Sequence, residues 1–376
     1  MTAVRVLFAV LGGALAVVTS ISVVRTLIIP RSRPGGVFDK GERLVDQIYR
    51  MALWRCDDYE RRDQVLASKA PVILIVQLIL WLVAFLVAFS LLEWVHTRDL
   101  GLAFSDTGSS MFLGFIVIHG AGANTTGILA AACGLITITL QIAYLPTLYA
   151  AFNRRETLVA LLQSRAGLPP WGPELLVRTR WGIAGDRDDL PAFFSAWEGW
   201  AADVAESHSN YPILVQFRSP RPLTSWLIGL LAVLDSAALL LATSPSRDRI
   251  EPRLCLRMGF TALQQVADSL GIPYDADPDP DSDIQLSYAE FEMGIQRLLD
   301  VGFEVERDAE AAWPHFRGWR VNYESIAYAL AYRIDAVPTY WSGPRSWTDN
   351  VIAPKRPPAR RPKDTSSGKQ PSVEAT

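Results

Sequence analysis

The sequence predicts an all-α membrane protein in which three transmembrane helices precede a cytoplasmic all-α domain. Three observations lead to this class: three long runs without charge before residue 153, apolar residues at helical spacing after it, and no stretch with the alternation of a β-strand. Half of the 376 residues are hydrophobic and the mean hydropathy is +0.17, which is high for a soluble chain. The net charge of −3 is too small to indicate a nucleic-acid partner.

The three apolar runs are each long enough to cross the lipid bilayer, which requires about 20 residues. They cover 6–24, 70–92 and 127–152. The first run is preceded only by Arg5, and its cluster of arginines follows it, whereas a cleaved signal peptide has its charges in front. We therefore expect an N-terminal transmembrane helix over 1–30.

Lysine and arginine are unequally distributed between the runs. Residues 93–126 contain only Arg98, whereas residues 30–70 contain nine: Arg31, Arg33, Lys40, Arg43, Arg50, Arg55, Arg61, Arg62 and Lys69. Because cytoplasmic loops carry the excess of basic residues, this distribution predicts that 31–69 is cytoplasmic and 93–126 is outside. The chain is then expected to be a multi-pass protein of the plasma membrane with its C-terminal domain in the cytoplasm.

The cytoplasmic parts differ in character. In the linker 31–69, Leu44, Ile48 and Ala52 share one helical face, which predicts an amphipathic helix against the membrane surface. Residues 153–347 are predicted to form an α-helical domain, with a helix ending at Gly271 and a capping box at Ser287 and Glu290. The basic, proline-rich tail 348–376 is predicted to be disordered.

A fourth apolar run, 223–244, is interpreted as a buried helix of this domain. It contains Asp235, and a carboxylate in the middle of a membrane costs about 2.5–3.5 kcal/mol. A crossing here would also place the basic tail outside. We expect Asp235 to be a hydrogen-bonded carboxylate of the core.

The stretch "MFLGFIVIHGAGANTTG" at 111–127 is compatible with three kinds of site. A dinucleotide-binding turn requires an acidic residue about 20 positions after Gly122, where the sequence instead has the third apolar run. A hydrolase requires a G-x-S-x-G elbow, which the serines here do not form. The sequence therefore predicts no enzyme and implies no cofactor.

The third kind of site fits the flanking runs. A segment 103–123 between an outer helix 70–94 and an inner helix 124–152 has the layout of a channel pore unit, in which a re-entrant loop forms a filter. Irregular backbone at membrane depth is tolerated where it lines protein or water. An ordinary extracellular loop is the alternative.

Several motifs resemble a family of bacterial membrane proteins related to two-helix potassium channels. "GSSMFLGF" and "IAYLPTLYAAFNRRETLVALLQSRAGLPP" are similar to its pore unit, and "WEGWAADVAESHSNYP", "FRSPRPLTSWLIGLLAVLDSAALLL" and "FRGWRVNYE" to its cytoplasmic region. The resemblance covers roughly 100–345. It implies transport of a monovalent cation by a homo-tetramer, because one pore loop per chain requires four chains to close a filter.

The filter-like residues are Phe112, Leu113, Gly114, Phe115 and Ile116, and they depart from the family. A potassium filter reads T-x-G-[YF]-G, in which a threonine hydroxyl and successive carbonyls replace the ion's water. Here Phe112 occupies the threonine position or that position is deleted, and Ile116 replaces the second glycine, at which a positive φ is required. Two functions therefore stay open: a cation-conducting channel, and a non-conducting membrane sensor or scaffold with a relic filter.

Two residues of the inner helix are candidates for a hinge or kink. Gly134 lies midway along it, where it serves either as a gating hinge or for close helix packing. Pro146 removes a backbone hydrogen bond and is expected to kink the helix.

No metal site is predicted. Asp279, Asp281, Asp283 and Glu290 have the spacing of a calcium-binding EF-hand loop, but Ile284 stands where that loop requires glycine. None of the four histidines is spaced as a metal pair, and Glu206 and His208 fall on different helix faces.

Overall fold

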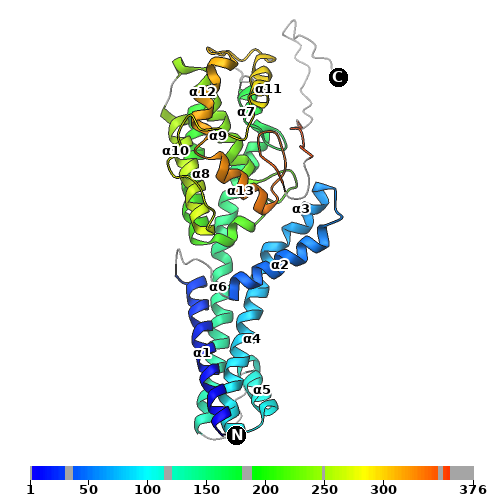
Figure 1. The fold of residues 1–376 in the computed structure, drawn as a ribbon, viewed down its shortest axis with the longest axis vertical. Helices are drawn as coiled ribbons and strands as arrows, with labels where there is room; N and C mark the ends of the chain where they lie inside the picture. Colours follow the sequence, from blue (N-terminus) through cyan, green and yellow to red (C-terminus); the bar gives the residue numbers. More distant parts are fainter. Residues whose placement is uncertain are drawn as a thin grey trace, which may run out of the picture.

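The computed structural model describes residues 2–29, 37–113, 121–179, 189–247, 250–345 and 350–355. These residues form helices and their connections, and the β interactions among them amount to one isolated bridge between Leu168 and Lys355. Figure 1 shows an elongated molecule with long helices at one end, where the N-terminus lies, and a packed group of shorter helices at the other. The prediction of an all-α chain is confirmed.

The long helices are α1 (Thr2–Leu27), α4 (Lys69–Thr97) and α6 (Ala121–Ala166). Together with α9 (Trp226–Thr243) they are long and apolar enough to cross a membrane. Helix α1 packs along α4 at Gly12, where a Cβ atom would lie 2.6 Å from the Ala88 carbonyl oxygen. Such small residues let two apolar helices approach closely.

Helix α6 is longer than the predicted inner helix, which ends at residue 152. It runs unbroken for 46 residues, through Pro146, and its last turns contribute Val159, Leu162 and Ala166 to the core of the shorter helices. Hydropathy falls at Arg154 because a charged face begins there, but the backbone continues as an α-helix to Ala166. The apolar run therefore marks a change of surroundings along one helix, and not its end.

Two helices precede α4 and form a hairpin that we call the arm. They are α2 (Val37–Leu53) and α3 (Tyr59–Ala67). Asp58 caps α3 by accepting a hydrogen bond from the Glu60 amide, and α3 leads almost directly into α4. Figure 1 shows the arm projecting sideways between the long helices and the shorter ones.

The helices that follow α6 in the chain pack around α9 and, with the end of α6, form the helical domain. They are α7 (Gly172–Thr179), α8 (Asp189–Asn210), η2 (Pro212–Gln216), η3 (Pro245–Arg247), α10 (Ile250–Leu270), α11 (Tyr288–Leu299), α12 (Ala309–Arg320) and α13 (Glu324–Ile334). Every residue of α9 except Leu241 is buried among them. This agrees with the interpretation of 223–244 as an internal helix, although its length and composition also suit a membrane.

Local signals of the domain match their predictions, and one boundary differs. Gly271 has the positive φ (+66°) of a helix-ending glycine, and Ser287 and Glu290 form the capping box. The tail was expected to be disordered from 348, but 350–355 lie on the domain. The Leu168 and Lys355 backbones exchange two hydrogen bonds of 3.0 and 2.8 Å, and this pairing holds the segment although its composition favours disorder.

Candidate functional site

The connection between α4 and α6 contains two short helical segments. Helix α5 (Leu100–Gly108) starts three residues after α4 ends at Thr97, with Asp99 accepting a hydrogen bond of 3.1 Å from the Leu102 amide. It continues into η1 (Ser109–Leu113), a single π-helical turn. The segment therefore leaves the end of α4 as a helix, as the predicted pore half-helix requires.

Contacts of α5 and η1 define how far the segment reaches along its neighbours. A Cβ at Gly108 would lie 3.8 Å from the Leu86 side chain of α4, and a Cβ at Gly134 of α6 would lie 2.5 Å from Cγ of Met111. At a rise of about 1.5 Å per residue, Leu86 is about 16 Å from the end of α4 and Gly134 is about 20 Å from the start of α6. The chain thus travels well down the helix pair between residues 99 and 111.

Met111 is the buried end of this segment. Its side chain lies in one cluster with Trp81, Phe85 and Phe89 of α4 and Ala130 of α6. Gly134 is needed at this contact because a side chain there would overlap Met111. Close packing accounts for the glycine, and its use as a gating hinge stays a prediction.

Buried polar residues occur both in this segment and in the part of α4 that precedes it. Glu93 and Ser90 belong to α4, Thr107 to α5 and Ser110 to η1, and all four are buried. The Thr126 hydroxyl of α6 donates a hydrogen bond to the Glu93 carboxylate. Polar groups buried between apolar helices are costly unless they are paired, so such a group marks a functional position more often than a packing accident.

The filter-like residues are only partly described. Phe112 and Leu113 belong to the π-helical turn η1, so their backbone is helical and lacks the extended ladder of a filter. The Phe112 side chain is exposed. Gly114, Phe115 and Ile116 lie outside the described residues.

The inner helix is joined to the helical domain by Arg155. This arginine is completely buried and donates hydrogen bonds of 2.9 Å to the Leu214 carbonyl and 2.8 Å to the Phe217 carbonyl. Its Nε also donates to the Glu156 carboxylate, across 2.8 Å. Arg155 therefore ties α6 to η2 at Leu214 and to Phe217, the residue that directly follows η2.

A histidine completes this junction. Nε2 of His208 lies 3.0 Å from Nη1 of Arg155, and because a guanidinium only donates, Nε2 must be the unprotonated acceptor. Burial lowers the pKa of His208 well below its ordinary value, and the charge of Arg155 lowers it further. His208 is thus a neutral structural group. Its position, apart from the exposed Glu206, agrees with the prediction that the two residues fall on different faces.

The arm has its own junction with the domain, built from charged residues. Nε of Arg62 donates to Asp335 across 2.7 Å, and Nε of Arg218 donates to Asp63 across 2.5 Å. Arg218 also donates to the Tyr59 hydroxyl across 2.8 Å. Burial raises the pKa of Asp63, while Arg218 opposes that shift. No local pattern in the sequence predicts this set, because its members come from three distant segments.

Asp235 has the role expected of it. Its carboxylate accepts hydrogen bonds from Arg320 (2.5 Å) and from the Tyr323 hydroxyl (2.9 Å) inside the domain. Burial raises its pKa to about 6, and Arg320 limits the rise. It is a paired core carboxylate.

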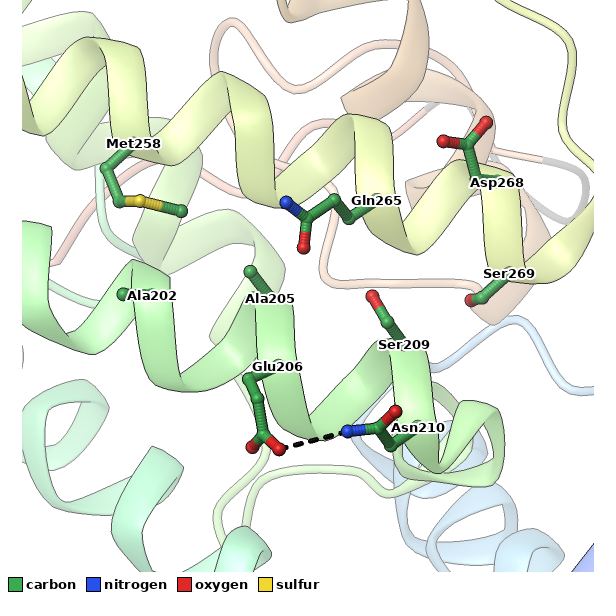
Figure 2. Close-up of a pocket in the computed structure, with 9 residues that line it drawn as sticks. All are labelled: Ala202, Ala205, Glu206, Ser209, Asn210, Met258, Gln265, Asp268 and Ser269. Atoms are coloured by element: carbon green, nitrogen blue, oxygen red, sulfur yellow. Dashed lines mark hydrogen bonds between the residues drawn. The ribbon is translucent and has the colours of Figure 1, made fainter. Parts of the chain in front are cut away.

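The domain surface carries a groove of about 600 Å³ between α8 and α10. Figure 2 shows Ser209, Gln265 and Ser269 along the gap between the two helices, with Glu206 held by Asn210 on one rim. The groove is rich in hydrogen-bond acceptors, and its remaining lining residues are Ala202, Ala205, Met258 and Asp268. It can accommodate a small ligand that donates hydrogen bonds. None of the residues that form the junctions described above lines it.

The residues with EF-hand spacing make other contacts. Glu290 accepts from the Ser287 amide and hydroxyl as part of its capping box, and Asp281 pairs with Arg317 across 2.9 Å. Within the described parts of the chain, no three histidine, cysteine or acidic residues are grouped to hold a metal ion.

Comparisons with protein-family models, with curated proteins and with solved structures found no match to this chain.

Proposed function

We propose that the chain is one subunit of a channel-like membrane protein in which α4, α5 and α6 form the pore unit. In this proposal α1, α4 and α6 cross the plasma membrane, the predicted pore loop 103–123 enters the bilayer from outside, and the helical domain lies in the cytoplasm. Four copies surround a path for a monovalent cation, because one subunit supplies one pore segment.

The observation that carries this proposal is the contact between Met111 and Gly134. A loop that merely connected two helices outside the bilayer would have no need to reach about 20 Å along α6. The hydrogen bond from Thr126 of α6 to the buried Glu93 of α4 adds support, because a carboxylate between two apolar helices is costly unless it is paired.

A second candidate is a non-conducting membrane sensor or scaffold. The helical backbone of Phe112 and Leu113 favours it, because a potassium filter presents extended carbonyls at the equivalent positions. In this alternative the pore unit serves as a membrane anchor, and the domain carries the function. Both candidates share the arrangement of α6, which runs from the pore unit into the domain.

Ion flux distinguishes the two candidates. The full chain is reconstituted into liposomes, and potassium and sodium flux are compared for the wild type, Gly114→Asp and Gly199→Asp. Gly199 is the matched control because a side chain there meets open space on α8. Flux that is lost in Gly114→Asp and retained in Gly199→Asp supports a pore at this segment.

The absence of flux from a folded, tetrameric wild type would exclude conduction and leave the scaffold. The oligomeric state is therefore measured on the same preparation, by mass determination in nanodiscs. A monomer without flux would exclude the tetramer as well.

A further inference from the structure

Helix α2 presents a row of large apolar side chains to solvent. Leu44, Ile48 and Met51 of the helix, and Trp54 just beyond its end, are each at least half exposed. Their spacing of three and four residues places them on one face of the helix. Exposed apolar residues gathered in this way mark a surface that has a partner.

The opposite face of α2 is already occupied within the chain. Val45 and Leu53 are buried, Asp46 pairs with Lys69 across 2.7 Å, and the Tyr49 hydroxyl lies 2.7 Å from Oγ of Ser68. The apolar row is therefore not the core side of the arm. It is a second apolar face that the described residues leave uncovered.

Three arginines accompany this apolar row. Arg43, Arg50 and Arg55 are exposed, and the Arg55 guanidinium lies 4.6 Å from the ring centre of Trp54. An exposed apolar face beside basic residues is the pattern of a helix that lies in the interface of a membrane. Arginines in that position attract anionic lipid headgroups.

We propose that α2 lies on the bilayer surface and binds anionic lipid headgroups through Arg43, Arg50 and Arg55. Lipid is the expected partner of the apolar face of α2, because both ends of the arm are connected to long apolar helices. Val45 of α2 packs in one cluster with Leu27, at the end of α1, and with Ala70 and Ile73, at the start of α4. Figure 1 shows α2 on the side of the arm nearer to the long helices.

Hydrogen exchange of the full chain tests this proposal, independently of any ion flux. Exchange of the amides of 37–55 is measured in detergent, in nanodiscs of phosphatidylcholine alone, and in nanodiscs that also contain phosphatidylglycerol. We expect exchange to be slower by about fivefold or more in the anionic nanodiscs than in the neutral ones. The variant R43Q/R50Q/R55Q should lose this difference.

A matched variant separates lipid contact from loss of charge alone. R61Q/R253Q/R257Q removes the same number of charges from exposed residues of α3 and α10, and it should keep the protection. Equal protection of the 37–55 amides in detergent, in neutral nanodiscs and in anionic nanodiscs would overturn the proposal and indicate a second copy of the chain on this face. Equal protection in neutral nanodiscs with added glycerol 3-phosphate would overturn it in favour of a soluble phosphate.

Discussion

Arg62 of α3 donates a hydrogen bond of 2.7 Å to Asp335, a residue 273 positions further along the chain. Both side chains are almost completely buried, and Asp335 ends α13 with a positive φ of 49°. This contact closes the arm onto the helical domain. The linker before α4 and the end of the helical domain are separate parts in the sequence. In the structure this contact joins them into one unit.

Asp335→Asn should destabilise this unit. The change leaves the Arg62 guanidinium buried without its counter-charge, which typically costs about 3–5 kcal/mol, while asparagine tolerates the left-handed backbone. Thermal unfolding in detergent should show a clear loss for this variant. The control is Asp189→Asn, which removes the partner of Arg165 at an exposed pair of 2.6 Å and should change stability by less than about 1 kcal/mol. Equal effects of the two variants would contradict the importance of the buried pair.

Arg155→Met should weaken the connection between α6 and the domain. Methionine fills much of the volume, but the carbonyls of Leu214 and Phe217 and the Glu156 carboxylate lose their donor. Unpaired buried acceptors cost about 1–3 kcal/mol each, so we expect a loss of several kcal/mol. Its neighbour gives the control: Arg154→Met removes an exposed pair with Asp203 and should cost less than about 1 kcal/mol. Chemical denaturation followed by tryptophan fluorescence measures both variants.

Gly134→Ala should destabilise the contact between α6 and η1. The added Cβ would overlap Met111, and overpacking of this kind costs about 1–3 kcal/mol. Met111→Ala alone should cost about 2–5 kcal/mol, and adding Gly134→Ala to it should cost little more, since Met111→Ala removes the overlapping Cγ and Sδ atoms. Gly13→Ala in α1, where the new methyl meets open space, should be neutral or stabilising.

The same variants test the hinge interpretation of Gly134. If a hinge is needed, Gly134→Ala should lower flux in the Met111→Ala background although it adds little loss of stability there. No further loss of flux in that background would leave packing as the whole explanation of the glycine.

The contribution of His208 to the stability of the helical domain should fall as the pH drops below about 6.5. The pKa of His208 is lowered in the folded state, so below the unfolded pKa only the unfolded chain takes up a proton at this residue. This contribution is therefore fully present above that pKa and is lost by up to about 1.4 kcal/mol for each pH unit below it, whereas the raised pKa of Asp235 acts in the opposite direction below about 6. His208→Gln keeps an acceptor for Arg155 and should flatten this part of the pH profile. His315→Gln, at an exposed residue, should leave the profile unchanged.

The sequence predicted those features that depend on neighbouring residues. Uncharged runs located α1, α4 and the first part of α6, and Ser287 with Glu290 located the start of α11. Asp235 could be assigned to a core because a carboxylate inside an apolar run needs a partner wherever the run lies. The partner itself, Arg320, could not be named.

The junctions were not predicted because their partners are far apart in sequence. Arg62 and Arg155 look like ordinary surface arginines of a basic linker and of a helix end. Only the fold shows that both are completely buried. The end of α6 was missed for a related reason, since hydropathy responds to the surroundings of a helix and not to its hydrogen bonds.

The length of α6 gives the molecule the geometry of a lever. Gly134 and Arg155 lie about 20 residues apart on one unbroken helix, which corresponds to about 30 Å. A tilt of the domain by about 5° around the Arg155 anchor would therefore carry Gly134 sideways by about 3 Å, close to the width of a methyl group. Met111 packs directly against that glycine. A small rotation of α6 at the helical domain would therefore displace the contact between Gly134 and Met111.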